Sequence, residues 1–171
     1  MELTHRMYRG PGLISRVIGY FGAGYYSHID VRTPQGYYRG AFENERTVRG
    51  IWYPPGYEDR PEAYYGPALR VTDYTIDVSV GQWEEYWRAS NAKLHKPYDY
   101  RGLWETFVEG RQWRDNDSWW CSEAVADNLE QGYIITDLPS VMKAVEPGDC
   151  VFMFCARGAR IEEIWPKPAA A

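Results

Sequence analysis

The chain has 171 residues, of which 44% are hydrophobic and 25% charged, the composition of an ordinary globular protein. This length predicts one domain spanning residues 1–171. A net charge of −5 argues against a nucleic-acid partner held by phosphate neutralisation. No apolar run approaches the roughly 20 residues that span a bilayer, and the first residues lack the apolar stretch of a signal peptide. We expect no transmembrane segment and a cytoplasmic or phage-associated protein.

The first half of the chain reads mainly as strands. Apolar residues at a helical period predict a helix over residues 13–21. Alternating residues then predict strands at 26–32 and 37–41, separated by a turn, and a third strand at 47–52. Residues 53–67, rich in Pro, Gly and Tyr, are interpreted as a long loop and a candidate lid or rim.

The second half mixes helices with strands. A strand is expected at 69–78, and a capping box at Ser79 and Gln82 predicts a helix over 82–94. Its inward positions are expected to be Trp83, Tyr86, Trp87 and Leu94. A second helix should begin at Cys121 and end at Gly132, and an apolar run predicts a last strand at 150–156. This partial segregation predicts an α+β fold with a mainly antiparallel sheet.

The chain has three cysteines, Cys121, Cys150 and Cys155. An odd count without a signal peptide indicates reduced thiols rather than disulfides. Cys150 and Cys155 fall in the predicted last strand, so we expect buried structural thiols on opposite faces. The many aromatic residues, 15 Tyr and 8 Trp, either fill the core or line a groove, and we favour the core.

Cys121 is the candidate nucleophile, because the first turn of a helix presents unpaired N–H groups that favour a thiolate. A cysteine nucleophile needs a base, and the chain has three histidines. His5 lies in what reads as an N-terminal tail, and His95 follows a helix at an expected exposed end. His28 lies within a predicted strand, where period-two alternation places it on one face with Asp30. His28 is therefore the candidate base.

Three segments occur in a characteristic order: Tyr-Ser-His-Ile-Asp-Val at 26–31, Lys-Pro-Tyr-Asp at 96–99, and Trp-Cys-Ser-Glu-Ala-Val at 120–125. Together they resemble the circularly permuted branch of the NlpC-type papain-like cysteine hydrolases, which includes YiiX-like and lecithin retinol acyltransferase-like proteins. The resemblance covers roughly residues 13–156. It implies a papain-like sheet packed against the Cys121 helix, with Cys121 as nucleophile and His28 as general base.

The same resemblance places Tyr98 and Ser122 near the oxyanion and the substrate. Glu123 also matches the family pattern, but a carboxylate in the first turn of a helix is expected from the helix dipole alone. The backbone N–H of Cys121 is a natural oxyanion donor.

The sequence departs from the family at the third catalytic position. The family carries a polar residue on the strand after the histidine strand, whereas the closest position here is Gly40. Asp30 is the first candidate to orient His28 instead, because the strand period fixes its side. Glu43, Glu45, a backbone carbonyl or a water molecule are the alternatives.

These features predict a cysteine hydrolase that cleaves an amide or ester in a peptide, a cell-wall peptide or a lipid-linked acyl substrate, without a cofactor. The alternative is a non-catalytic binding or structural module that keeps the fold, for example in a phage particle or delivery system. A metal-dependent enzyme using His28, Asp30 and Cys121 is disfavoured, because the chain lacks close ligand pairs such as Cys-x-x-Cys.

Overall fold

A computed structural model describes residues 1–11, 15, 26–102, 117–136 and 145–165 of the protein. Its centre is a six-stranded sheet of order β6-β3-β2-β1-β7-β8, with antiparallel pairing throughout. The strands are β1 (Glu2–Arg9), β2 (His28–Arg32), β3 (Tyr38–Phe42), β6 (Gly56–Arg60), β7 (Arg70–Asp77) and β8 (Arg160–Trp165). The expected α+β class with a mainly antiparallel sheet is confirmed.

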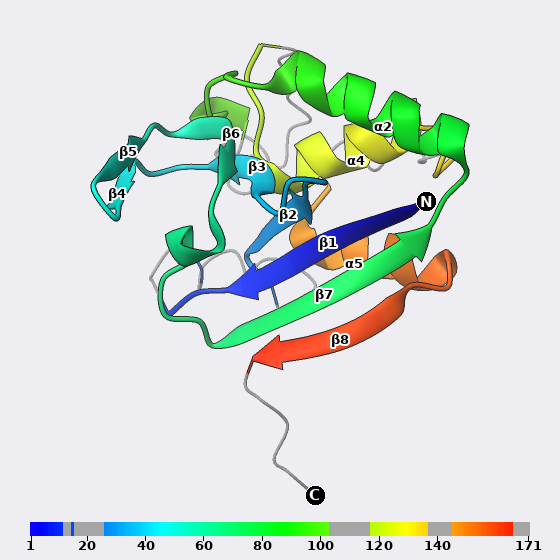
Figure 1. Ribbon diagram of the computed structural model, residues 1–171, viewed down its shortest axis with the longest axis horizontal. Helices are drawn as coiled ribbons and strands as arrows, with labels where there is room; N and C mark the ends of the chain where they lie inside the picture. The colour runs from blue at the N-terminus through cyan, green and yellow to red at the C-terminus, as the bar shows by residue number, and fades with distance from the viewer. Residues whose placement is uncertain (12–14, 16–25, 103–116, 137–144, 166–171) are drawn as a thin grey trace, which may run out of the picture.

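In the described part of the chain, three α-helices accompany the sheet: α2 (Val80–Lys93), α4 (Cys121–Gln131) and α5 (Pro147–Ala156). Figure 1 shows α5 behind β1 and β7, α2 crossing the top of the molecule, and α4 between α2 and β1. Buried apolar side chains from β1, β2, β7 and all three helices form one core, which includes Ile29, Val125 and Cys121. None of the helices in the described part of the chain has the length and hydrophobicity needed to cross a bilayer.

Several predicted elements are present close to their expected limits. β2, β3 and β7 match the strands expected at 26–32, 37–41 and 69–78. Helix α2 begins after Ser79, whose side chain and that of Gln82 form the expected capping box. Tyr86 and Trp87 are buried on α2, while Trp83 and Leu94 are half-buried. The helix expected at 13–21 lies outside the described residues.

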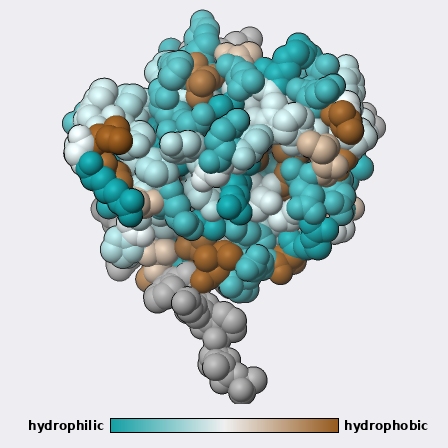
Figure 2. Space-filling model, in the orientation of Figure 1, coloured by the Kyte–Doolittle hydropathy of each residue, from teal (hydrophilic) through white to brown (hydrophobic). Residues whose placement is uncertain are grey.

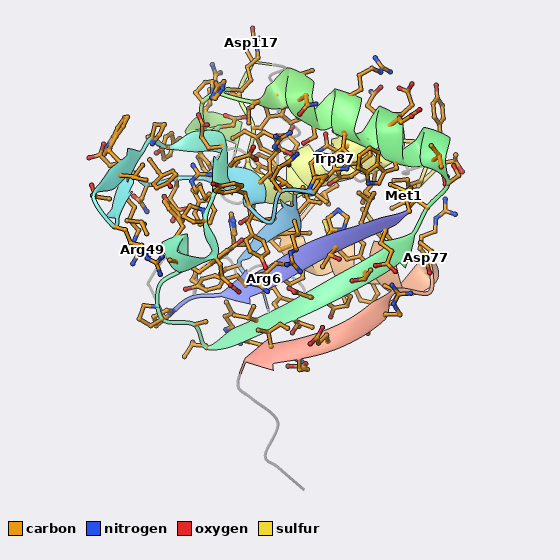
Figure 3. The ribbon with its side chains drawn as sticks, in the orientation of Figure 1. Met1, Arg6, Arg49, Asp77, Trp87 and Asp117 are labelled. Carbon is orange, nitrogen blue, oxygen red and sulfur yellow. The ribbon has the colours of Figure 1, made fainter. Side chains whose placement is uncertain are left out.

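The main difference from the expected structure is at the N-terminus, for which the sequence predicts a tail. Residues Glu2–Arg9 instead form β1, which pairs with β2 on one side and with β7 on the other. Its mixed sequence hides its position, because charged and polar residues such as Arg6 and His5 are buried there with partners. In Figure 3, Arg6 lies on β1 near the middle of the sheet.

The strand expected at 150–156 is wrong, because this segment belongs to α5. Glu146 and Asp149 form a capping box around Pro147, so a helix begins just before the apolar run. A six-residue apolar run fits a buried helix as well as a strand. Cys150 is buried as expected, but Cys155 is exposed, which corrects its assignment as a buried thiol.

Residues 47–53 and 53–67 also contain more structure than expected. The single strand predicted at 47–52 is a hairpin of β4 (Arg46–Val48) and β5 (Ile51–Tyr53), which turns at Arg49 and Gly50 with positive φ. The predicted long loop contains β6, an edge strand of the main sheet, and η1 (Glu62–Tyr64). Only the part around η1 therefore remains a candidate rim.

Candidate active site

Cys121 is the first residue of α4, directly after the N-cap residue Trp120. Its thiol therefore lies in the first helical turn, where backbone N–H groups have no intrahelical partner. Ala124, Val125 and Leu129 repeat at a helical period and are fully buried, so α4 packs against β2 and β3. This packing fixes Cys121 beside the start of β2. Cys121 itself is 6% exposed.

His28 is the first residue of β2 and is buried. The Cys121 side chain lies close enough to its ring to contribute to raising the pKa of His28. The two residues come from opposite halves of the chain, and the packing of α4 on β2 brings them together. On its other side, the His28 ring contacts the Phe42 ring, with centroids 4.0 Å apart. A rigid strand and two neighbours therefore hold the imidazole in place.

Asp30 supplies the carboxylate beside this histidine. It lies two residues after His28 on the same strand face and is fully buried. Its Oδ1 is 2.8 Å from His28 Nε2. Nε2 is therefore engaged with the carboxylate, which leaves Nδ1 for the thiol. The order thiol, imidazole, carboxylate is that of an activated nucleophile with an oriented base.

Gly40 leaves the space that the Asp30 carboxylate occupies. The antiparallel pairing of Val31 with Arg39 sets Asp30 opposite Gly40 on β3. A Cβ added to Gly40 would lie 1.5 Å from Asp30 Oδ1. No side chain larger than hydrogen fits there while Asp30 keeps its position. The glycine at the family's third catalytic position and the aspartate on the neighbouring strand are thus structurally complementary.

The charges around His28 favour its protonated form. Burial by itself would lower the pKa of His28, but the charges of Asp30 and Cys121 and hydrogen bonding by the protonated ring to these acceptors raise it to about 10. An imidazolium beside the thiol stabilises a thiolate. The electrostatics of the site therefore favour an imidazolium at His28 at neutral pH.

Tyr65 is a further member of this group that the sequence analysis did not identify. It follows η1, and its hydroxyl donates a short hydrogen bond to Asp30 Oδ2. Both carboxylate oxygens of Asp30 are thus engaged, one by His28 and one by Tyr65. Burial and the nearby Asp30 charge raise the pKa of Tyr65, which keeps the hydroxyl protonated and able to donate. Its place in a Pro- and Tyr-rich segment gave no signal of this contact.

The residues expected near the oxyanion have different surroundings. Tyr98 is buried, and the charge of Cys121 contributes to raising its pKa, which places it near the thiol. Ser122 is also buried, but its hydroxyl donates to the Val145 carbonyl at 2.5 Å. The Ser122 side chain is therefore committed to holding the start of α4 rather than turned to a substrate.

The alternative orienting residues lie on the turn after β3. The Glu43 carboxylate accepts a hydrogen bond from the Asn44 side chain, and Glu45 is exposed. Among the candidates considered, Asp30 is therefore the one that contacts His28. His95 is exposed beside Glu58, and His5 is buried against Tyr86, so neither belongs to this site.

The described residues were compared with the donor sets that hold metal ions in proteins. Within residues 1–11, 15, 26–102, 117–136 and 145–165, no three His, Cys, Asp or Glu side chains converge in a way that could hold a metal ion. Around His28, the Asp30 oxygens are taken by the imidazole and by Tyr65.

Comparison with known proteins shows what the fold is similar to. No family model matches the sequence, and no curated protein matches it. The fold is similar to the crystal structure of the metalloprotein YiiX from Escherichia coli O157:H7, with a TM-score of 0.64 and 16% sequence identity. The similarity covers 95% of this chain and 97% of that chain. It shows a YiiX-like fold.

Proposed function

We propose that this protein is a cysteine hydrolase of the circularly permuted papain-like type, with Cys121 as nucleophile, His28 as base and Asp30 as the residue that orients the base. One observation carries the proposal: the buried His28 ring contacts the Asp30 carboxylate through Nε2, and the Cys121 side chain is near enough to contribute to raising the pKa of His28. Such a constellation is recognised by geometry and roles rather than by residue order along the chain. The YiiX-like fold is compatible with it.

The proposed reaction has two stages. The Cys121 thiolate attacks the carbonyl carbon of an amide or ester, and backbone N–H groups at the start of α4, including that of Cys121, stabilise the oxyanion. The intermediate then collapses to a thioester, while the His28 imidazolium gives its proton to the leaving amine or alcohol. Neutral His28 next takes a proton from water, which hydrolyses the thioester and restores the thiol.

Reactivity of the three thiols tests the nucleophile directly. We expect iodoacetamide at neutral pH to alkylate Cys121 first, the exposed Cys155 second and Cys150 last, because burial raises the pKa of Cys150. Peptide mass spectrometry over time gives the three rates. Exposure alone would instead make Cys155 the fastest, and that order would contradict an activated Cys121.

Turnover supplies the second test. With p-nitrophenyl acetate as a generic acyl donor, we expect the wild type to release a burst of nitrophenol equal to the enzyme concentration. Cys121→Ser should abolish the burst, whereas Cys155→Ser, a matched change of an exposed thiol, should retain it. A full burst from Cys121→Ser would remove Cys121 as nucleophile.

Two other functions make different predictions. A binding module that merely keeps the fold would show neither the burst nor preferential alkylation of Cys121. The structural relative is described as a metalloprotein, but the Asp30 and His28 donors here already satisfy each other. Dialysis against a chelator should therefore leave the burst unchanged, and its loss with recovery on adding a divalent metal would favour the metal-dependent alternative.

A further inference from the structure

A pocket of about 240 Å³ opens on the His28 face of the sheet. Tyr8 and Phe42 form two of its walls, and they flank His28 on the neighbouring strands. Tyr8 is paired directly with His28 in the β1–β2 register, and directly opposed residues share a sheet face. Phe42 lies against the His28 ring. The pocket and the candidate base therefore share the same walls.

The remaining walls come from the segment around η1 and from the turn before β4. Tyr64 and Tyr65 close one side, and Asn44 and Arg46 line another. The rings of Tyr64 and Phe42 lie 4.7 Å apart at a steep angle, and those of Tyr65 and Tyr8 lie 5.3 Å apart. Such aromatic walls accept a further aromatic or aliphatic group well. A complete small-molecule site usually measures roughly 300–1,000 Å³, so this pocket suits one hydrophobic group rather than a whole ligand.

The proposed mechanism indicates which part of a substrate would carry the hydrophobic group that binds in this pocket. His28 must bring its proton within hydrogen-bond reach of the leaving amine or alcohol. The group attached to that atom consequently lies beside the His28 ring. Tyr8 and Phe42 flank this ring, so the pocket adjoins the leaving side of the scissile bond. Tyr65 also joins the two sites, because it lines the pocket and holds Asp30.

We infer that this pocket is the leaving-group subsite of the proposed hydrolase, and that it takes an aromatic or bulky aliphatic side chain carried by the leaving amine. The inference rests on the proposed function. It also assigns a role to the tyrosines around η1, which the sequence analysis regarded as a candidate rim. The pocket's occupant would be the residue that follows the scissile amide of a peptide.

Aminolysis of the acyl-enzyme tests the subsite without the natural substrate. After Cys121 is acetylated by p-nitrophenyl acetate, an added amine can attack the thioester carbon in place of water, so that the C–S bond breaks, an acetyl amide forms and the Cys121 thiol is restored. We expect phenylalaninamide to be acetylated about tenfold more efficiently than glycinamide, because its ring is buried in the pocket. Hydrolysis by water in the same reaction is the internal reference.

A pocket-filling variant and a matched control locate the preference. Asn44→Trp places a large ring at the pocket wall and should bring the preference to about one. Thr47→Trp puts the same ring on an exposed residue of β4 outside the pocket, and the preference for phenylalaninamide should stay about tenfold. The burst measured on each variant reports its folded, active fraction. A burst in the wild type without a preference for phenylalaninamide overturns the subsite. A preference that survives Asn44→Trp overturns it as well. The absence of any burst refutes the proposed function and the subsite with it.

Discussion

His5 and His28 lie on adjacent strands and are both buried, yet their surroundings oppose each other. His28 faces a carboxylate and a thiol, and its pKa is raised to about 10. His5 faces neutral groups: its Nε2 is 3.0 Å from the Tyr86 hydroxyl, and its ring stacks on Phe154 at 4.6 Å. Burial lowers the pKa of His5 to about 3. Burial by itself therefore keeps an imidazole neutral, and charged neighbours must outweigh burial before the ring is available as an acid.

The strongest test of this comparison removes the charge beside His28. In Asp30→Asn, burial of His28 remains while its main charged partner is lost, so the imidazole should become neutral, as His5 is. We expect the acylation rate with p-nitrophenyl acetate to fall roughly thousandfold. Asp59→Asn, which removes the half-exposed partner of Arg39, is the control. If the two variants differ by less than about threefold, Asp30 does not orient the base.

A substitution at Gly40 can displace the Asp30 carboxylate without changing its charge. Gly40→Ala puts a Cβ 1.5 Å from the present position of Asp30 Oδ1, so the carboxylate must leave His28. A displacement of this size should lower the acylation rate about a hundredfold. Gly81→Ala, where no atom lies within 4 Å of the added Cβ, should be harmless.

A double mutant separates this effect from a general loss of stability. In the Asp30→Asn background, Gly40→Ala should cost much less than a hundredfold further, because the interaction it breaks is already absent. Additive losses in the double mutant would contradict a shared mechanism. Urea unfolding of each variant shows whether it is folded under the assay conditions.

Removing the hydroxyl that holds Asp30 should have a smaller effect. Tyr65→Phe deletes one hydrogen bond to a buried carboxylate, and we expect about a tenfold lower acylation rate. The unshared carboxylate should also raise the pKa of His28 further, so the alkaline limb of the pH–rate profile should move to higher pH. Tyr37→Phe, at an exposed position, is the control. A uniform rate loss with an unmoved pH profile would indicate only a packing role.

The smallest expected effect is that of His5 on the stability of the protein at acid pH. The pKa of His5 in the folded state is lowered from 6.5 to about 3. The contribution of the neutral, buried ring to the free energy of unfolding is therefore complete above pH 6.5 and is lost as the pH falls below that value. The free energy of unfolding should fall by up to about 1.4 kcal/mol per pH unit from this group. Urea titrations between about pH 6.5 and 4.5 should show a shallower fall for His5→Gln. An equal slope in both proteins would mean that His5 is not buried in the neutral form.

The start of α4 and the positions of β2, β3, β7 and α2 could be predicted because their signals are local. Ser79 and Gln82 form a cap within one turn, and His28 and Asp30 share a face by the strand period alone. The order β6-β3-β2-β1-β7-β8 could not be obtained this way. Strand pairing depends on contacts between distant segments, and the polar residues of β1 conceal that this strand is central.

The segments whose structure differs from the prediction have sequence patterns that are compatible with two structures. The apolar run at 150–156 suits a strand or a buried helix, and the cap at Glu146 decides for the helix. The segment at 53–67 has the composition of a loop, yet backbone pairing with β3 makes part of it an edge strand. In both cases the neighbouring elements, rather than intrinsic preference, determined the outcome.

For the site, the sequence by itself determined the identity of a helix-start thiol, a strand histidine and an aspartate on the same strand face, because each follows from local periodicity. Only the tertiary structure decided that α4 packs on β2 so that Cys121 meets His28, that Gly40 leaves room for the Asp30 carboxylate, and that Tyr65 holds it. The physical reason is that these contacts join residues far apart in the chain, and their energies depend on burial and register that no local pattern contains.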